Sequence, residues 1–290
     1  MIKKMIFSVL ALSTVLVSCS SDDDNNSMEP TTSSLTLNLS GMEPLGANYV
    51  YEGWIIVDGA PVSTGTFSSV TFPQTFTVNT VQLSSATTFV LSIEPTNDLD
   101  PDPSATKILA GDFSGNAANV STGIVGDFLN ASGAYFLRTP TDENGTNNGN
   151  DENGIWFGTP GAPPTPNFNL PTLPNGWAYE GWVVGDSGPL STGTFNMFDI
   201  VDHAAPFSET MQSGPPVPGE DFFLNAPAGE TFPLDVRNRT VVISIEPVPD
   251  NSPAPFVMKP LVGVTGTATA PATHDLGLNL SSMPTGSVSR

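Results

Sequence analysis

Apolar residues occupy every second position in four stretches of the chain, which are 35–39, 89–93, 241–245 and 276–280. Alternation of this kind gives one face of a strand to a core and the other face to water. No stretch carries the 3.6-residue apolar period of a helix over a useful length, and 28 prolines and 27 glycines interrupt the chain at short intervals. The pattern predicts an all-β protein built from short strands and frequent turns.

Two blocks of the sequence occur twice. Residues 51–67 return at 179–195 with 11 of 17 positions identical, and residues 90–111 return at 242–263 with the same Ser-Ile-Glu-Pro motif. The offset of 128 residues between the first pair of blocks is far longer than the ~20–50 residues of solenoid and propeller repeats. We therefore expect two tandem domains, each large enough to bury a core of its own.

The offset grows from 128 residues for the first pair of blocks to 152 for the second, which indicates an insertion of 152 − 128 = 24 residues. The insertion lies between Phe195 and Val242, in a stretch rich in Pro, Gly and Ser. We expect a long surface loop there, at about 201–231.

The predicted fold is a pair of tandem immunoglobulin-like β-sandwiches, with Trp54 and Trp182 at equivalent places in their cores. The expected divisions of the chain are a signal peptide (1–18), an acidic flexible tether (19–34), a first sandwich (35–165) with an acidic loop (141–154) and a Pro-rich linker (159–167), and a second sandwich (168–290).

The beginning of the chain resembles the export signal of a bacterial lipoprotein. Two lysines precede a 13-residue apolar run at 5–17, which is too short to span the ~30 Å core of a bilayer and leads into Leu-Val-Ser-Cys. This ending predicts cleavage before Cys19, the only cysteine of the chain, and lipidation of its side chain. The acidic run at 22–26 is interpreted either as an export tag or as a solvated tether. We expect an outer-membrane lipoprotein exposed at the cell surface.

The chain is strongly acidic, with 29 Asp and Glu against 8 Lys and Arg and a formal charge of −21. Loss of residues 1–18 would remove two lysines and change the charge to 6 − 29 = −23. Such a chain repels nucleic acid and anionic membrane surfaces, so the lipid on Cys19 is the expected membrane contact. With one cysteine and two histidines, neither a disulfide nor a Cys-rich or multi-His metal site is expected. The remaining partner would be an unidentified protein or glycan.

Lysine is scarce in this chain, yet it stands at the same place in both copies. Glu94 and Lys107 lie 13 residues apart with a turn sequence between them, and Glu246 and Lys259 repeat this spacing. The spacing predicts a cross-strand ion pair in each domain.

The repeated glutamates also raise the question of acid–base catalysis. Glu52 with Glu94, or Glu180 with Glu246, could be imagined as the two carboxyl groups of a glycoside hydrolase. Such a site occupies one cleft, however, and is not duplicated in two small domains. The sequence contains no serine-nucleophile elbow and no Gly-rich phosphate loop. We expect no enzymatic activity.

The segment 141–154 is rich in Asp, Glu, Asn and Gly. Calcium prefers hard oxygen ligands, which four acids of this segment would offer: Asp142, Glu143, Asp151 and Glu152. The spacing is not that of an EF-hand, and the same residue types favour any tight loop. A calcium site and a plain hairpin loop between strands at 135–137 and 155–157 both remain open, and no other cofactor is predicted.

Three motifs follow one another in both copies: Tyr-Glu-Gly-Trp, Gly-Thr-Phe and Glu-Pro. In the first copy they lie at 51–54, 65–67 and 94–95. As a set, they resemble the extracytoplasmic C-terminal domain of anti-sigma-K factors. The resemblance implies a β-sandwich outside the cytoplasm without a defined ligand. It does not imply anti-sigma activity, which in that family belongs to a zinc-associated helical domain in the cytoplasm, joined through a transmembrane helix.

Three functions are compatible with these observations. The first, which we favour, is a surface-anchored and non-catalytic interaction or sensory module, with exposed aromatic residues around Trp156 or at 201–231 as its binding surface. The second is a component of extracytoplasmic signalling of the anti-sigma type. The third is an enzyme acting on an extracellular polysaccharide.

Overall fold

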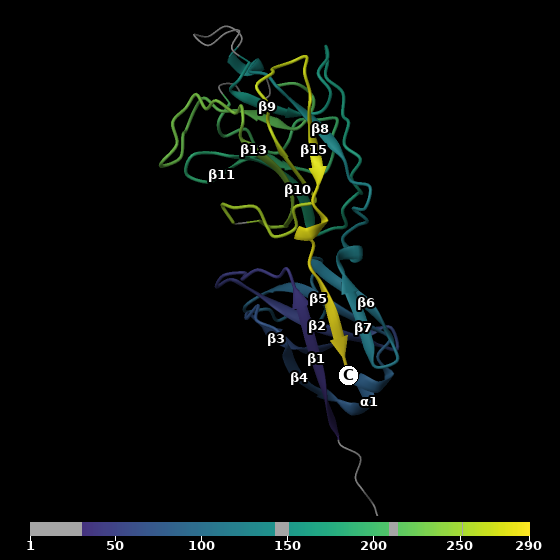
Figure 1. Ribbon diagram of the computed structural model, residues 1–290. Coiled ribbons are helices and arrows are strands. Elements are labelled where there is room, and N and C mark those ends of the chain that lie inside the picture. Colours follow the sequence, from purple (N-terminus) through teal and green to yellow (C-terminus); the bar gives the residue numbers. More distant parts are fainter. Residues whose placement is uncertain (1–30, 143–150, 209–213, 251) are drawn as a thin grey trace, which may run out of the picture. The chain divides into compact units, whose positions relative to one another are not determined.

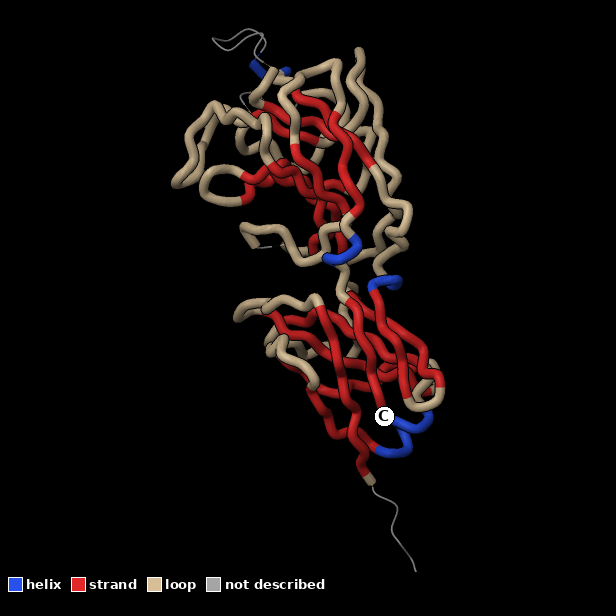
Figure 2. Tube along the Cα trace, in the orientation of Figure 1, coloured by secondary structure: helices blue, strands red, loops and turns tan. Residues whose placement is uncertain are grey.

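The computed structural model describes residues 31–142, 151–208, 214–250 and 252–290. Within these residues the protein is all-β, with two eight-stranded antiparallel sheets and a few short helical turns (Figures 1 and 2). The helical turns are α1 (Thr80–Ser85) and the 3-10 turns η1 (Thr122–Ile124), η2 (Pro140–Asp142) and η3 (Leu280–Ser282). No helix of the described ranges is long and apolar enough to cross a membrane.

The first sheet contains the first seven strands and the last strand of the chain. In the order in which they pair, its strands are β3 (Ala60–Phe67), β2 (Tyr49–Val57), β5 (Thr88–Pro95), β6 (Lys107–Ser114), β7 (Ala117–Ser121), β16 (Thr285–Ser289), β1 (Thr32–Ser40) and β4 (Gln74–Asn79). The alternation seen in the sequence is realised in β1, where Leu35, Leu37 and Leu39 are all buried.

The second sheet contains the other eight strands. In pairing order they are β11 (Pro189–Phe195), β10 (Trp177–Val184), β13 (Thr240–Pro247), β14 (Leu261–Val264), β15 (His274–Leu278), β8 (Gly133–Leu137), β9 (Gly154–Phe157) and β12 (Gly219–Asp221). The hairpin expected at 135–137 and 155–157 is confirmed as β8 paired with β9, with Tyr135 opposite Phe157.

Equivalent strands follow one another in the same order in both sheets. The repeated sequence blocks make β2, β3 and β5 equivalent to β10, β11 and β13, and the remaining strands then correspond position by position. In each sheet the two outermost strands approach each other, β3 with β4 and β11 with β12. Each sheet therefore curls towards closure, in the manner of a barrel.

The two repeats exchange their last strands. Along the chain the first repeat runs from β1 to β8 and the second from β9 to β16. In space, however, β16 lies between β7 and β1 in the first sheet, and β8 lies between β15 and β9 in the second. Figure 1 shows the yellow β16 running among the purple and blue strands of the first sheet. Neither repeat completes a sheet from its own strands.

Arg290 helps to fix the end of β16 in the first sheet. Its guanidinium donates hydrogen bonds to the carbonyl oxygens of Ala86 at 2.8 Å and Gly115 at 3.1 Å. The same group lies 4.3 Å from the centre of the Phe113 ring, in a cation–π arrangement. Val288 within the strand is fully buried and adds apolar contact.

This exchange differs from the expected division into 35–165 and 168–290. Residues 133–157 pair within the second sheet, and residues 285–289 pair within the first. Strand pairing also links all eight strands of each set into one continuous sheet, so it does not divide them into the two sheets of an immunoglobulin-like sandwich. The exchange of strands has a physical reason. β8 and β16 each pair with two strands whose edges would otherwise be unpaired.

The inserted segment, expected as a surface loop at about 201–231, is partly buried. It contributes β12, which pairs with β9 at the edge of the second sheet, and its Val217 and Phe222 are fully buried. Trp156 in β9 is only 3% exposed, so it offers no exposed aromatic surface. The apolar residues of the segment extend the second core.

Candidate functional site

The repeated Tyr-Glu-Gly-Trp motif forms a bulged hairpin in both sheets. The register between β2 and β3 shifts after Gly53, and the register between β10 and β11 shifts after Gly181. A Cβ atom at either glycine would collide with the hydroxyl of a threonine on the paired strand, Thr64 or Thr192. The close approach of the two strands therefore requires glycine at this place in both copies.

Each repeat buries a tryptophan that begins a chain of hydrogen bonds. Trp54 is 3% exposed and its Nε1 donates to Oγ of Ser92 at 2.8 Å, while Ser92 donates to the carboxylate of Glu94. Trp182 is 2% exposed and begins the same chain, with an Nε1 to Oγ distance of 2.8 Å, through Ser244 to Glu246. This series of hydrogen bonds gives the buried polar groups of the core their partners. It requires the serine and glutamate of the repeated Ser-Ile-Glu-Pro motif.

The glutamate at the end of this chain holds the loop that follows its strand. Glu94 accepts a hydrogen bond from the backbone N–H of Ser104 at 2.9 Å. Glu246 accepts one from the backbone N–H of Phe256, at 2.9 and 3.1 Å to its two oxygens. The donor lies 10 residues beyond the glutamate in both repeats. Loop anchoring thus accounts for the presence of the glutamate in both copies.

The ion pair expected between Glu94 and Lys107 is not formed. The two residues do lie on paired strands, but a bulge between Leu91 and Ser92 places Lys107 opposite Ser92. The ammonium group of Lys107 instead donates to the carbonyl oxygen of Ser104 at 2.8 Å. A shift in register has therefore separated the two charges.

Within the described residues, Glu246 and Lys259 form no ion pair either. Lys259 precedes β14, which begins at Leu261, so it is not in a ladder with the strand of Glu246. Its charge acts on Glu43, where it opposes the increase in pKa that burial causes. The separation of 13 residues between the glutamate and the lysine is therefore explained by the anchored loop between them in both repeats, and not by an ion pair.

The second repeat brings three carboxylates together. Glu180 in β10, Glu246 in β13 and Asp250 in the loop after β13 offer oxygens that all lie within 4.8 Å of one another. Across the described ranges, no other group of three or more acidic, histidine or cysteine side chains converges in this way. Glu180 is 5% exposed, Glu246 is fully buried and Asp250 is half-buried. We call these three residues the acidic triad.

The surroundings of the acidic triad disfavour three negative charges. Burial raises the pKa of Glu180 to about 7 and that of Glu246 to about 8, and the nearby charge of Asp250 adds to both increases. Oε1 of Glu180 accepts a hydrogen bond from Ser191, but Oε2 faces no hydrogen-bond donor among the described residues. Buried carboxylates this close cannot all remain charged unless a cation lies between them. Without a cation, at least one of them holds a proton.

The first repeat carries the same three residues without the same arrangement. Glu52, Glu94 and Asp98 correspond to the acidic triad in sequence. Glu52 is partly exposed and accepts a hydrogen bond from Ser63, and Asp98 is exposed to solvent. These carboxylates do not converge into a group.

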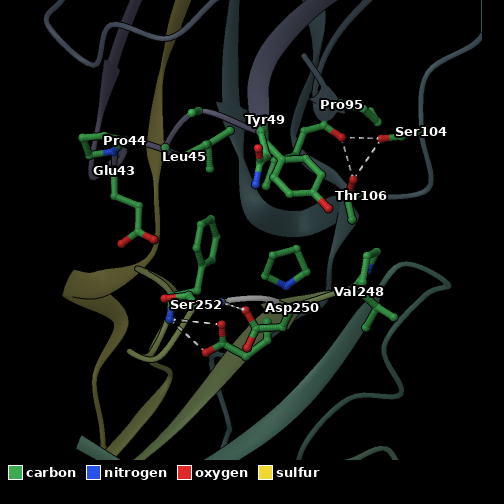
Figure 3. Close-up of a pocket in the computed structure, with 18 of the residues that line it drawn as sticks. Glu43, Pro44, Leu45, Tyr49, Pro95, Ser104, Thr106, Val248, Asp250 and Ser252 are labelled. Atoms are coloured by element: carbon green, nitrogen blue, oxygen red, sulfur yellow. Dashed lines mark hydrogen bonds between the residues drawn. The ribbon is translucent and has the colours of Figure 1, made fainter. Parts of the chain in front are cut away.

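A cavity of about 640 Å³ opens beside the acidic triad and is lined by Glu246 and Asp250. Loops of the first sheet, at 43–49 and 104–106, supply the rest of its lining together with the loop after β13. Figure 3 shows Tyr49, Ser104 and Thr106 facing Asp250 and Ser252 across this space. Pockets of this size, with mixed apolar and polar linings, are typical of ligand sites.

A second set of buried acids lies in the inserted segment. Burial raises the pKa of Asp202 to about 7 and that of Glu220 to about 8. Asp202 accepts a hydrogen bond from the backbone N–H of Gly219 at 2.8 Å, and Glu220 accepts one from the hydroxyl of Ser208. These bonds tie the segment to β12. Sequence reasoning missed both acids, because they have no counterpart in the first repeat.

The calcium ligands expected in the segment 141–154 fall into two groups. Glu143 lies outside the described residues, and so does the side chain of Asp142. Asp151 accepts a hydrogen bond from the backbone N–H of Thr139 at 3.3 Å, and Glu152 lies 3.3 Å from the guanidinium of Arg237. The two described acids are thus engaged with different partners. Cys19, expected to be lipidated, also lies outside the described residues.

Comparison with known families finds one match. Residues 26–107 match the family described as anti-sigma-K factor rskA, C-terminal. The match includes β1 to β5 and ends where β6 begins, so the first repeat contains an RskA-like C-terminal domain. The second repeat lies outside the matched residues, and its likeness rests on the shared hairpin and hydrogen-bond chain. No curated protein and no solved structure matches the chain.

Proposed function

We propose that the protein is a lipid-anchored lipoprotein of the cell surface that binds a partner without catalysing a reaction. The observation that carries this proposal is the cavity of about 640 Å³ lined by loops of both sheets. The lipobox-like ending at Cys19 and the acidic run that follows it support anchoring and surface exposure. Each curled sheet would supply the scaffold that holds its cavity loops.

The arrangement of the acids supports a non-catalytic role. The repeated glutamates that would be needed for glycoside hydrolysis accept hydrogen bonds from backbone N–H groups and buried serines. Retaining and inverting glycosidases keep two carboxyl groups about 5 Å or more apart across the scissile bond, with room for a sugar between them. One oxygen from each member of the acidic triad lies within 4.8 Å of the others, and both glutamates of the triad are buried, which leaves no room for a sugar between them.

The experiment combines anchoring with cavity binding. Surface proteins would be cross-linked to the intact chain on cells, and the captured partner would be compared between the wild type, Leu45→Arg and Leu99→Arg. Leu45 lines the cavity, whereas Leu99 is 96% exposed and does not line it. Loss of the partner in Leu45→Arg alone supports the proposal, and equal capture by all three contradicts it.

Cys19→Ala should abolish fatty-acid labelling, and equal labelling would contradict the anchor.

A second candidate function is a part in extracytoplasmic signalling of the anti-sigma type. It is favoured by the match of residues 26–107 to the anti-sigma-K factor family. The chain has one cysteine and two histidines, which do not supply the zinc ligands of the cytoplasmic anti-sigma domain. Any such part would therefore be that of an envelope sensor acting through another protein. Deletion of the gene should then change transcription from one sigma factor's promoters, and an unchanged transcript profile would exclude this role.

A further inference from the structure

We propose that Glu180, Glu246 and Asp250 form a binding site for a divalent, oxygen-preferring cation, of which calcium is the expected occupant. The three ligands all belong to the second repeat, although Glu246 and Asp250 also line the cavity. The proposal does not rest on the proposed function, because it concerns only the ligands of the ion and is tested by ion binding alone.

The geometry fits a single ion. Oxygen ligands lie about 2.3–2.6 Å from Ca²⁺, so two ligands on opposite sides of one ion are about 5 Å apart at most. The oxygens that the acidic triad offers lie within 4.8 Å of one another. The donors are all carboxylates, which are the hard oxygen ligands that calcium and magnesium prefer.

The buried oxygen of Glu180 is the observation that points to a ligand. Glu180 is 5% exposed, and its Oε2 faces no hydrogen-bond donor in the described part of the chain. A buried carboxylate oxygen without a donor is destabilising, because it has lost its contacts with water. The neighbouring Asp250 presents another carboxyl group, and a hydrogen bond between the two needs a proton on one of them. A cation between them would satisfy both.

The ion pairs of the described residues do not bring a positive side chain to the acidic triad. Among the described residues, Arg237 forms its ion pairs with Glu152 and Asp235, and Arg239 pairs with Asp186. None of these pairs includes a member of the acidic triad. The chain as a whole carries a formal charge of −21, which raises the local concentration of cations around it.

An entry path exists on one side of the site. Glu246 and Asp250 line the cavity described above, and the half-buried Asp250 is the ligand that water and a hydrated ion can reach from it. Asp250 also stabilises its own loop, since it accepts a hydrogen bond from the backbone N–H of Ser252 at 2.8 Å. Three carboxylates leave coordination positions for water from this cavity, as Ca²⁺ takes six to eight oxygen ligands.

The first test measures Ca²⁺ binding by calorimetry with the full chain after treatment with a chelator. Asp250→Asn removes one charged ligand from a half-buried loop position and should weaken binding by at least about tenfold. The matched control is Asp98→Asn, because Asp98 is the equivalent residue of the first repeat and also accepts a backbone hydrogen bond two residues on, at 2.9 Å. This control should bind like the wild type.

A second variant separates this site from the segment 141–154. Asp151→Asn should leave the affinity unchanged if the acidic triad is the site. Loss of Ca²⁺ binding in Asp151→Asn but not in Asp250→Asn would overturn the proposal, and so would a wild type that binds no Ca²⁺ at millimolar concentrations. Mg²⁺ in a parallel titration would show whether the site prefers the larger ion.

Terbium luminescence gives a readout that does not depend on stability. Tb³⁺ bound at the acidic triad would be excited by Trp182, whose indole is linked to Glu246 through Ser244. Trp177, which packs on the ring of Phe256, would also excite the ion, so the test changes a ligand and keeps the tryptophans: Asp250→Asn should remove most of the sensitised emission, and Asp98→Asn in the first repeat should retain it. Equal emission from both variants would place the bound ion elsewhere and contradict the proposal.

Discussion

Glu52 and Glu180 stand at equivalent positions of two hairpins that share most of their sequence, yet only Glu180 is buried within a group of acids. One difference between the two hairpins is the inserted segment, which packs only against the second. In the second repeat, Asp202 and Ala204 of this segment pack against Gly193 of β11, whereas in the first repeat the equivalent glycine lies beside Phe76 of β4. The insertion thus covers the hairpin, and the same motif acquires a different electrostatic environment. Duplication supplied the residues, and the added segment changed the environment of one copy.

We expect the largest effect from removal of the last strand, which tests whether the repeats depend on each other through the exchanged strands. A chain that ends after Met283 lacks β16 and leaves β7 and β1 without the strand between them. We expect the first sheet to unfold, because two long edges and the pocket of Val288 become exposed. The measurement is circular dichroism together with hydrogen exchange of both sheets. A chain that keeps native protection in the first sheet would show that β16 contributes little.

The next prediction compares the two buried tryptophans. Trp54→Ala and Trp182→Ala should each lower the free energy of unfolding by about 3–5 kcal/mol, since each removes a large buried side chain and breaks the hydrogen bond to a serine. Because the repeats share strands, both variants should shift one common thermal transition. Calorimetry would reveal two separate transitions if the repeats unfold independently, as separate tandem sandwiches would.

The dependence of stability on pH should distinguish the two repeats. Folding raises the pKa of Glu180 to about 7 and those of Glu246 and Glu220 to about 8, against an ordinary value of 4.5. The folded chain therefore holds protons that the unfolded chain has released. This contribution is fully present below about pH 4.5 and is lost as the pH rises to about 8. Without divalent cations, the melting temperature should fall over this range.

A variant of one buried acid would assign this effect. Glu220→Gln should make the pH profile flatter, since an amide cannot ionise. An unchanged profile in this variant would contradict the contribution of the buried acids.

The smallest expected effect concerns the two lysines. Neither Lys107 nor Lys259 forms an ion pair with the repeated glutamate, so Lys107→Met and Lys259→Met should each change stability by less than about 1 kcal/mol. Chemical denaturation would measure this change. A larger loss that is specific to Lys107 would indicate that its bond to the Ser104 carbonyl is important for the anchored loop.

Four strands of this fold, β1, β5, β13 and β15, could be predicted from alternation, and the pairing of β8 with β9 and of β5 with β6 could be predicted too. The exchange of β8 and β16 could not, because equivalent strands offer the same apolar face to either sheet. β12 also escaped prediction, since three residues in a Pro- and Gly-rich stretch carry no recognisable period.

The candidate site was partly visible in the sequence. The repetition of Glu94 as Glu246 indicated a role for this glutamate, but the spacing suggested a lysine partner. A single bulge in β5 was enough to invalidate that inference. The convergence of Glu180 with Asp250 depends on loop conformation and burial, which no local pattern specifies.

The exchanged strands also determine when each part of the chain can finish folding. The side chain of Ser40 in β1 donates a hydrogen bond to the backbone of Thr285 in β16, across 245 residues of sequence. Contacts between such distant segments form slowly, and they cannot form at all until the last strand has been synthesised. The sheet that begins first is therefore completed last. A chain that is proposed to leave the cytoplasm before it folds gains from this order, because its N-terminal half cannot close while the C-terminal half is still on the ribosome.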